Sequence, residues 1–401
     1  MKQNRSWIIQ ICAIGIAICL GSFSVGIIFS ISPLYITSVL GITIASIGIL
    51  EGITEALAQL SKLASGVFTD YFKKKKPLLV FAFLMSALSK PIFILAGGFN
   101  LILTSKLIER LSNGLMATPR DLYVVDIAPP KRKSSCLGII MTFKFLGIIG
   151  GSLLSAYLIY LTNNNYTLIM WVGFALSMLA VIILILFMRD VERPNDESLQ
   201  SKKRVINWSE IKSMNKYYWF ILFIATIFMA TRFSEAFIIL YMNYLNCPTE
   251  ICASVIAIQN LTSFITCAPI GYVSDRIGIP ITLAITILIH CLANFCFLIA
   301  DGLLLGLMGV VLWGIQRAAS QILFISLISN VVDQKILGTA IGIFHLITGV
   351  AALFASIIAG WLATNSSFES LFNFGLSVSL FSLVVFVIYH YFPKKVFAKA
   401  F

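Results

Sequence analysis

The feature that most constrains this chain is a series of twelve apolar runs, each long enough to cross a lipid bilayer. A bilayer core is about 30 Å thick, and a helix that crosses it needs about 20 mostly apolar residues. The hydrophobic fraction of 59% in 401 residues agrees with that number of spans. The runs cover residues 7–30, 42–68, 78–97, 101–119, 136–160, 166–188, 217–243, 251–273, 281–300, 302–328, 337–362 and 369–392. We therefore predict an all-α membrane protein with twelve transmembrane helices.

The charge content excludes several other classes of protein. Only 11% of the residues are charged, whereas soluble domains have about 25%. The net charge of +12 arises from bases placed between apolar runs, not from a basic polar face. A soluble multidomain enzyme, a disordered chain and a nucleic-acid binder are therefore not expected.

One connection is much more polar than the others and divides the chain. Residues 189–216 hold seven bases together with several acids, while the remaining connections are short. We predict an N-terminal six-helix bundle over 1–190, a cytoplasmic linker over 191–216 and a C-terminal six-helix bundle over 217–401.

The basic residues of the connections predict the orientation. When the connections are numbered alternately from the N-terminus, one set carries 21 bases and the other carries none. Bases collect on the cytoplasmic side of membrane proteins. Both termini and the linker are therefore predicted to be cytoplasmic, and the high usage of Ile, Asn and Lys suggests a bacterial inner membrane.

Two landmarks recur at nearly the same spacing in the two halves. Gly66 and Asp70 end the second run as Gly271 and Asp275 end the eighth, at an offset of 205 residues. An arginine lies on the fourth run and another on the tenth, 207 residues apart. The spacing predicts a duplicated six-helix unit in parallel orientation. The glycine permits close helix approach, and the aspartate can cap or pair with a neighbouring helix end.

These motifs resemble those of the major facilitator superfamily, over essentially the whole chain. The matching residues are Gly271, Asp275, Arg276 and Gly278 in the second half, Gly66 and Asp70 in the first, and Arg110, Asn113 and Gly114 on the fourth run. The resemblance implies two pseudo-symmetric six-helix bundles, gating loops at the two glycine–aspartate motifs, and transport by alternating access.

Ionisable residues inside the apolar runs mark the candidate pathway. Such a residue at the bilayer centre costs about 3 kcal/mol or more, so it normally faces a cavity. The second and fourth runs each place their polar residues on one helical face. The candidate residues for the solute or proton pathway are Glu51, Glu55, Arg110, Asn113, Lys144, Arg232, Glu235 and Arg317.

Several of the membrane charges and histidines have simpler interpretations, which the sequence leaves open. Arg232 and Glu235 are three residues apart and can form a structural ion pair on one helical face. Lysines and arginines near helix ends can extend to the interface, and the two histidines fit a role as core residues. These residues are Lys62, Arg120, Lys90, Lys106, His290 and His345.

The charges also suggest a solute and a driving ion. Bases at mid-depth outnumber the acids available to pair with them, which favours an anionic or zwitterionic solute. Glu51, Glu55 and Glu235 are the candidate proton carriers, because burial and neighbouring charges shift the pKa of a carboxyl. Efflux by proton antiport and a non-transporting receptor on the same fold are the alternatives, and the direction of transport stays open.

The sequence contains none of the motifs that would indicate enzymatic or metal chemistry. No HExxH, GxSxG or GxxxxGK[ST] pattern and no CxxC pair occurs. We therefore expect no catalytic residue, metal or cofactor, and a monomer whose partners are a small solute, a proton and the bilayer. Cys247 and Cys252 share a short loop and are either thiols or a disulfide.

Overall fold

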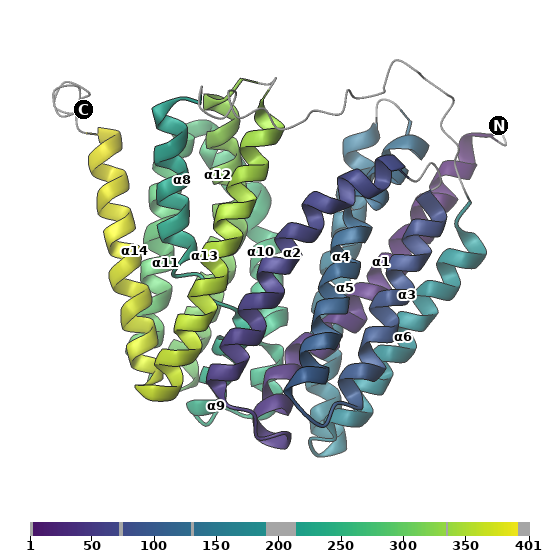
Figure 1. The fold of residues 1–401 in the computed structure, drawn as a ribbon, viewed down its shortest axis with the longest axis horizontal. Coiled ribbons are helices and arrows are strands. Elements are labelled where there is room, and N and C mark those ends of the chain that lie inside the picture. The colour runs from purple at the N-terminus through teal and green to yellow at the C-terminus, as the bar shows by residue number, and fades with distance from the viewer. Residues whose placement is uncertain (1–2, 72–74, 130–131, 190–213, 334–335, 392–401) are drawn as a thin grey trace. The chain divides into compact units, whose positions relative to one another are not determined.

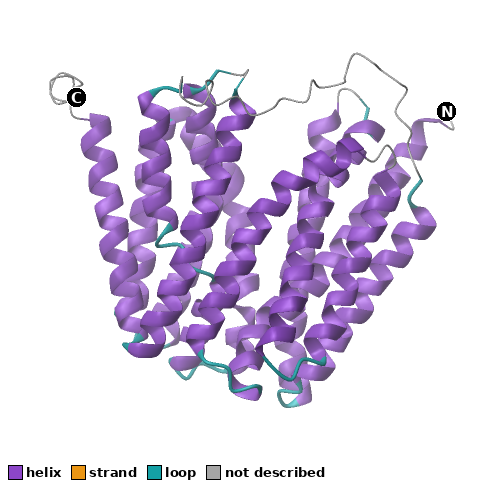
Figure 2. Ribbon diagram, viewed as in Figure 1, coloured by secondary structure: helices purple, strands orange, loops and turns teal. Residues whose placement is uncertain are grey.

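Every regular element of the described residues is a helix. The computed structural model describes residues 3–71, 75–129, 132–189, 214–333 and 336–391. Within these ranges no strand occurs, and short loops join the helices (Figure 2). The predicted all-α membrane fold is therefore confirmed. Most of the predicted linker lies outside the described residues.

The first half contains six long helices in chain order (Figure 1). They are α1 (Gln3–Leu34), α2 (Ile44–Tyr71), α3 (Lys75–Ile94), α4 (Phe99–Ile127), α5 (Lys133–Thr162) and α6 (Tyr166–Phe187). α1 continues without interruption into a π-helical turn, η1 (Tyr35–Val39), just after Pro33.

Seven helices occur in the described residues of the second half, because one predicted span is divided. They are α8 (Lys216–Met229), α9 (Glu235–Tyr244), α10 (Thr249–Ile277), α11 (Ile279–Leu298), α12 (Leu303–Val331), α13 (Leu337–Asn365) and α14 (Phe368–Tyr391). The predicted run 217–243 corresponds to α8 and α9 together, with residues 230–234 outside both helices.

Nine helices of the described chain are long and apolar enough to cross a membrane. The predicted number of twelve is not reproduced by this criterion. α2 and α4 have 28 and 29 residues, but the charged side chains on them lower their hydropathy. α8 has only 14 residues because the seventh span is interrupted.

The chain forms two compact units, and each has the same set of helix contacts. The first comprises Met1–Lys203 with Pro248–Ala257, and the second Arg204–Cys247 with Ile258–Phe401. In the first unit α1 packs on α5 and α6, α4 packs on α2 and α3, and α3 packs on α6. In the second, α8 packs on α13 and α14, α12 on α10 and α11, and α11 on α14. A duplicated six-helix unit predicts this correspondence.

Glycine permits a close helix contact at equivalent places in the two units. A Cβ on Gly114 of α4 would overlap the Ser61 side chain of α2 and lie 2.9 Å from its carbonyl carbon. A Cβ on Gly314 of α12 would overlap the Thr262 side chain of α10 and lie 2.8 Å from the Gln259 carbonyl oxygen. Small residues let membrane helices approach in this way.

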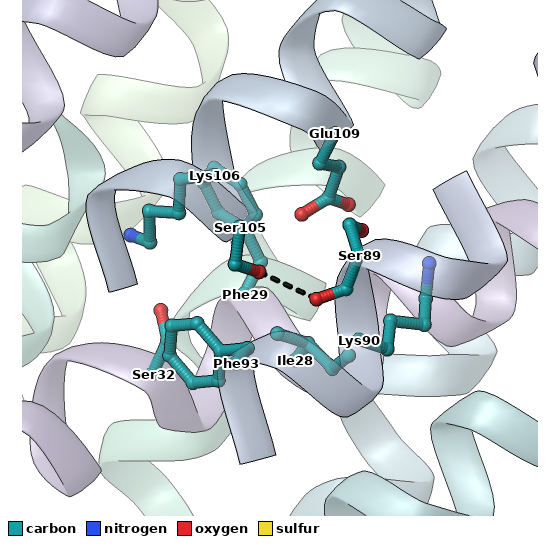
Figure 3. A pocket seen from close by; sticks show the side chains of 9 residues that line it. All are labelled: Ile28, Phe29, Ser32, Ser89, Lys90, Phe93, Ser105, Lys106 and Glu109. Atoms are coloured by element: carbon teal, nitrogen blue, oxygen red, sulfur yellow. Dashed lines mark hydrogen bonds between the residues drawn. The ribbon is translucent and has the colours of Figure 1, made fainter. Parts of the chain in front are cut away.

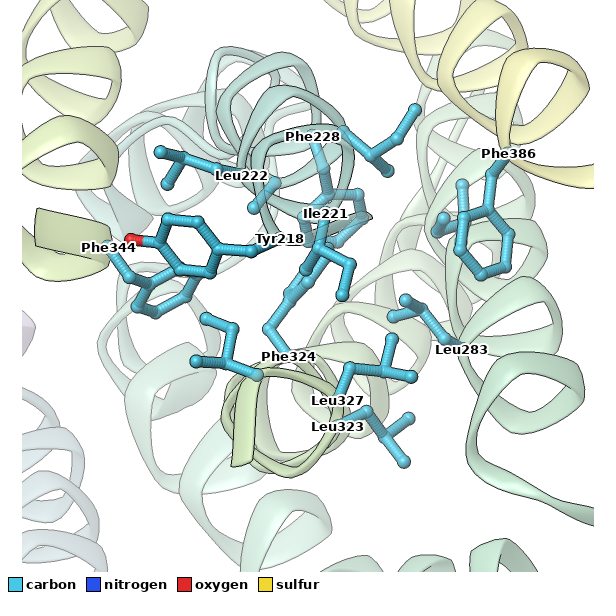
Figure 4. Close-up of a cluster of buried hydrophobic side chains, with 14 of the residues drawn as sticks. Tyr218, Ile221, Leu222, Phe228, Leu283, Leu323, Phe324, Leu327, Phe344 and Phe386 are labelled. Carbon is cyan, nitrogen blue, oxygen red and sulfur yellow. The ribbon is translucent and has the colours of Figure 1, made fainter. Parts of the chain in front are cut away.

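An aromatic and aliphatic core joins the helices of the second unit (Figure 4). Phe228 of α8 packs on Phe324 of α12, with their ring centroids 5.9 Å apart. The Tyr218 hydroxyl donates a hydrogen bond of 3.0 Å to the Ala340 carbonyl of α13. This core holds α8 in place up to the residue where its helix stops.

The first prediction concerns the contact at Gly114. Gly114→Ala should destabilise the protein by about 1–3 kcal/mol, because the added methyl group overlaps the backbone of α2. Gly138→Ala on α5 is the matched control: a Cβ there meets no described atom within 4 Å, so it should be neutral or stabilising by up to about 1 kcal/mol. Thermal unfolding of the purified protein in detergent measures both. Equal effects of the two substitutions would contradict the prediction.

Candidate functional site

A buried ion pair connects α2 and α4 in the first unit. The Lys106 ammonium contacts the Glu51 carboxylate, and their side chains are only 8% and 3% exposed. Phe29 of α1 covers the same region, with the Lys106 nitrogen 5.6 Å and the Arg110 guanidinium 4.8 Å from its ring centroid. The aromatic face adds a favourable cation–π contact for both bases.

The remaining candidates of this unit lie along the same helices or on α5. Glu55, one turn after Glu51, accepts a hydrogen bond of 2.9 Å from the Gln59 amide. Arg110 and Asn113 of α4 are half-buried. Lys144 on α5 is exposed.

The interruption of the seventh span is the most unusual backbone feature of the second unit. α8 ends at Met229, residues 230–234 are not helical, and α9 begins at Glu235. Ser234 is the N-cap of α9, and its side chain accepts a hydrogen bond of 3.3 Å from the Ala236 amide. Non-helical backbone at membrane depth occurs where it is buried in protein or lines a cavity.

Three candidate residues meet at this interruption. Glu235, in the first turn of α9, forms an ion pair of 2.9 Å with Arg317 of α12, and their side chains are 16% and 34% exposed. Arg232 donates a hydrogen bond of 3.4 Å to the Ser320 hydroxyl on α12. The predicted helical spacing of Arg232 and Glu235 is absent, because Arg232 precedes the start of α9.

A buried polar network supports the interruption through Thr231. The Thr231 hydroxyl donates a hydrogen bond of 2.7 Å to the Phe228 carbonyl and lies 3.1 Å from Nε2 of His290 on α11. Asn294 donates a hydrogen bond of 2.9 Å to the His290 carbonyl. His290 also contacts Phe228 and Trp313 with centroid distances of 5.0 and 4.9 Å. The histidine is a core residue, as one interpretation of the sequence proposed.

Lys90 and Lys106 do not extend to the interface, which was one of the interpretations that the sequence left open. Lys90 is 1% exposed, and its ammonium donates hydrogen bonds of 2.7 and 3.2 Å to the carbonyl and hydroxyl of Ser86. Lys106 is 6% exposed and turns to Glu51. Position along the helix suggested the interface, but helix rotation directs both side chains inwards.

The second glycine–aspartate motif is only partly explained by the structure. Gly278 has φ of 91°, a conformation that glycine adopts without strain, and it separates α10 from α11. Asp275 is exposed, and Arg276 lies over the Tyr272 ring at 4.3 Å. A Cβ on Gly271 would meet no described atom within 4 Å, so no close approach is seen there among the described residues. The surroundings of Gly66 and the side chain of Asp70 lie outside what the structure describes.

The two cysteines near the start of α10 do not form a disulfide. Cys247 lies in the loop between α9 and α10, and Cys252 lies in the first turn of α10. Burial raises the pKa of the Cys247 thiol, which favours its protonated form. Among the described residues no group of three metal-ligating side chains occurs.

Two features of the site escaped the sequence analysis. The interruption contains neither glycine nor proline, so the usual signals of a broken helix are absent. Ser234 followed by Glu235 is nevertheless a typical helix start, with a hydroxyl N-cap and an acid in the first turn. Glu109 is the second omission, because it was not among the candidate residues although it is adjacent to Arg110 in the sequence.

Comparisons with known proteins agree on one family. The model of the Major Facilitator Superfamily matches residues 14–347 and, in a second match, 253–400. An uncharacterized MFS-type transporter of Methanocaldococcus jannaschii is 27% identical over 396 residues, 96% of each chain.

Solved structures share the fold. That of the nucleoside transporter NupG has a TM-score of 0.78 at 15% identity, covering 96% of this chain and 100% of that chain. A variant of the peptide transporter POT has a TM-score of 0.75 at 13% identity, covering 94% of each.

A double-mutant cycle tests the ion pair at the interruption. Glu235→Gln and Arg317→Met should each destabilise the protein, and the double variant should lose less than the sum, with a coupling of about 1–3 kcal/mol. The control cycle pairs Glu235→Gln with Lys216→Gln at the exposed start of α8 and should be additive. Thermal unfolding in detergent provides the measurement. Additivity in both cycles would show that the ion pair contributes nothing.

Proposed function

The chain belongs to the major facilitator superfamily of transporters, and we propose that it moves a small anionic or zwitterionic organic solute by alternating access. A member of this family binds solute at a site that opens to each side of the membrane in turn. Interior charges are costly in lipid, so their retention on α2, α4, α9 and α12 supports a binding role. A receptor or scaffold on the same fold would not need them.

The observation that carries the solute class is the charge ratio at the interruption of the seventh span. Two guanidinium groups, Arg232 and Arg317, share this region with one carboxylate, Glu235. Guanidinium groups are suited to carboxylate and phosphate oxygens, because their N–H groups form a planar fork. An anionic group of the solute can therefore compete with Glu235 for the two arginines.

The other candidate residues have supporting roles in this proposal. Arg110 and Lys144 add positive charge in the first unit, and Asn113 adds a hydrogen-bonding amide on the same helix as Arg110. The glycine–aspartate motifs, Gly66 with Asp70 and Gly271 with Asp275, are the gating loops. In the second motif Arg276 and Gly278 complete the pattern.

Proton coupling is part of the proposal, with Glu51, Glu55 and Glu235 as the carriers. Each lies beside a group that responds to its charge: Lys106 faces Glu51, Gln59 faces Glu55 and Arg317 faces Glu235. Protonation of a carboxylate releases such a partner, so proton binding and solute binding can affect each other.

The same proposal places the protein in a bacterial inner membrane as a monomer with cytoplasmic termini. The 21 bases in one set of connections and the absence of bases from the other support this orientation.

Flux measurements test the solute class. Purified protein in proteoliposomes should accumulate members of a panel of small carboxylates or amino acids and should not accumulate cationic amines. Arg317→Gln and Arg110→Ala should each lower kcat/KM for the transported solute by about tenfold or more, because a charge-assisted hydrogen bond is lost.

Lys216→Gln, at an exposed position, is the control and should transport normally. Transport of cationic amines alone, or unchanged anion flux in both arginine variants, would refute the anionic assignment. Absence of flux for every class of solute would favour the receptor alternative.

Proton coupling has its own test. Glu51→Gln, Glu55→Gln and Glu235→Gln are compared for uptake driven by an imposed pH gradient and for solute exchange without a gradient. At least one variant should lose accumulation against a gradient but retain exchange, because the neutral amide carries no proton. Glu369→Gln, exposed at the start of α14, is the control. Unchanged accumulation in all three variants would exclude these carboxyls as carriers.

A further inference from the structure

Four of the buried charges of the first unit lie close together, and two of these four are joined in an ion pair. Lys106 of α4 contacts Glu51 of α2, while Lys90 of α3 and Glu109 of α4 are 1% and 8% exposed. Lys90 and Glu109 border one small cavity at the contact between α3 and α4. The four charges sum to zero, and no ion pair joins Lys90 to Glu109.

Glu109 is the member whose hydrogen bonding is incomplete. Its Oε1 is buried and has no hydrogen-bond partner among the described residues. Lys90 directs its ammonium to Ser86, one turn earlier on its own helix. A buried carboxylate oxygen without a hydrogen-bond partner destabilises the protein. A second arrangement in which Glu109 gains a partner would remove that cost.

Glu109 and Lys106 border the same small cavity (Figure 3). Its polar lining includes Ser89 and Ser105, and the Ser105 hydroxyl donates a hydrogen bond of 2.6 Å to the Ser89 carbonyl. The volume of this cavity that the centre of a water molecule can occupy is about 10 Å³. That is close to the volume required for one water molecule. In Figure 3 the Lys106 ammonium points away from Glu109, so contact between the two requires the Lys106 side chain to turn.

The spacing on α4 puts Glu109 within reach of Lys106. Residues three apart on a helix are neighbours on its surface, and oppositely charged pairs at this spacing interact. Lys106 has four side-chain carbons about which its ammonium can turn. It therefore has two acidic neighbours: Glu51 across the contact with α2, and Glu109 one turn further along its own helix.

We propose that Glu109 is the alternative ion-pair partner of Lys106, and that Lys106 exchanges Glu51 for Glu109 when Glu51 is engaged by solute or proton. The exchange frees Glu51 and keeps the Lys106 ammonium paired, whereas breaking a buried ion pair without a new partner is strongly destabilising. The role in coupling rests on the proposed transport function. The exchange itself is a property of the cluster and can be measured without any solute.

A substitution series on the purified full-length protein tests the exchange through thermal unfolding in detergent. Glu51→Gln alone should lower Tm only moderately, because Lys106 turns to Glu109. Glu109→Gln alone should leave Tm unchanged or raise it. The double variant should lower Tm by more than the sum of the two single shifts, since Lys106 then has neither carboxylate. Adding Lys106→Met to the double variant should recover much of that loss.

Glu51→Gln with Ser105→Ala is the matched control, because Ser105 borders the same cavity without carrying charge. This pair should be additive. Additive shifts for Glu51 and Glu109, or failure of Lys106→Met to recover stability, would overturn the proposal. Both results are independent of transport, so they leave the flux experiments as a separate test of function.

Discussion

The structure depends on the requirement that backbone N–H and C=O groups find partners within the protein wherever lipid excludes water. Along the described spans, helical hydrogen bonds satisfy this requirement everywhere except at residues 230–234. There the amides of Ala230, Thr231 and Arg232 bond to carbonyls of the last turn of α8, at 2.9 to 3.2 Å. Ser234 caps α9, and Thr231 is held by the His290 network. The interruption is thus stabilised from both sides, which allows Arg232 and Glu235 to leave the regular helical spacing.

The two units share their packing and differ in their charges. The helix pairings correspond one to one, and the close contacts at Gly114 and Gly314 lie on equivalent helices. The first unit keeps its first helix continuous into the π-helical turn, whereas the second divides the equivalent seventh span. The two units therefore share the helix contacts that determine their fold, while their polar side chains differ.

Hydropathy and charge position predicted the helices, because lipid acts on each residue according to its own polarity, and the family was indicated by the resemblance of the glycine–aspartate and arginine motifs. Hydropathy and charge position did not predict which way a side chain points, because that depends on the rotation of its helix. Lys90 and Lys106 lie near helix ends in the sequence, yet both point into the bundle. The partner of Glu235 proved to be Arg317, about 80 residues away, because tertiary packing decides which side chains meet. The divided span was missed since apolar residues continue through it without glycine or proline.

Each unit places one interior charge within reach of two opposite charges. In the first unit one base, Lys106, has two acids within reach, Glu51 and Glu109; in the second, Glu235 lies near two bases, Arg232 and Arg317. A single buried ion pair has one favourable arrangement, and breaking it leaves an uncompensated charge. A third group removes that cost, because the released charge can pair again within the same cluster. Three-membered clusters therefore permit changes of partner in a low-dielectric interior, which isolated pairs would resist.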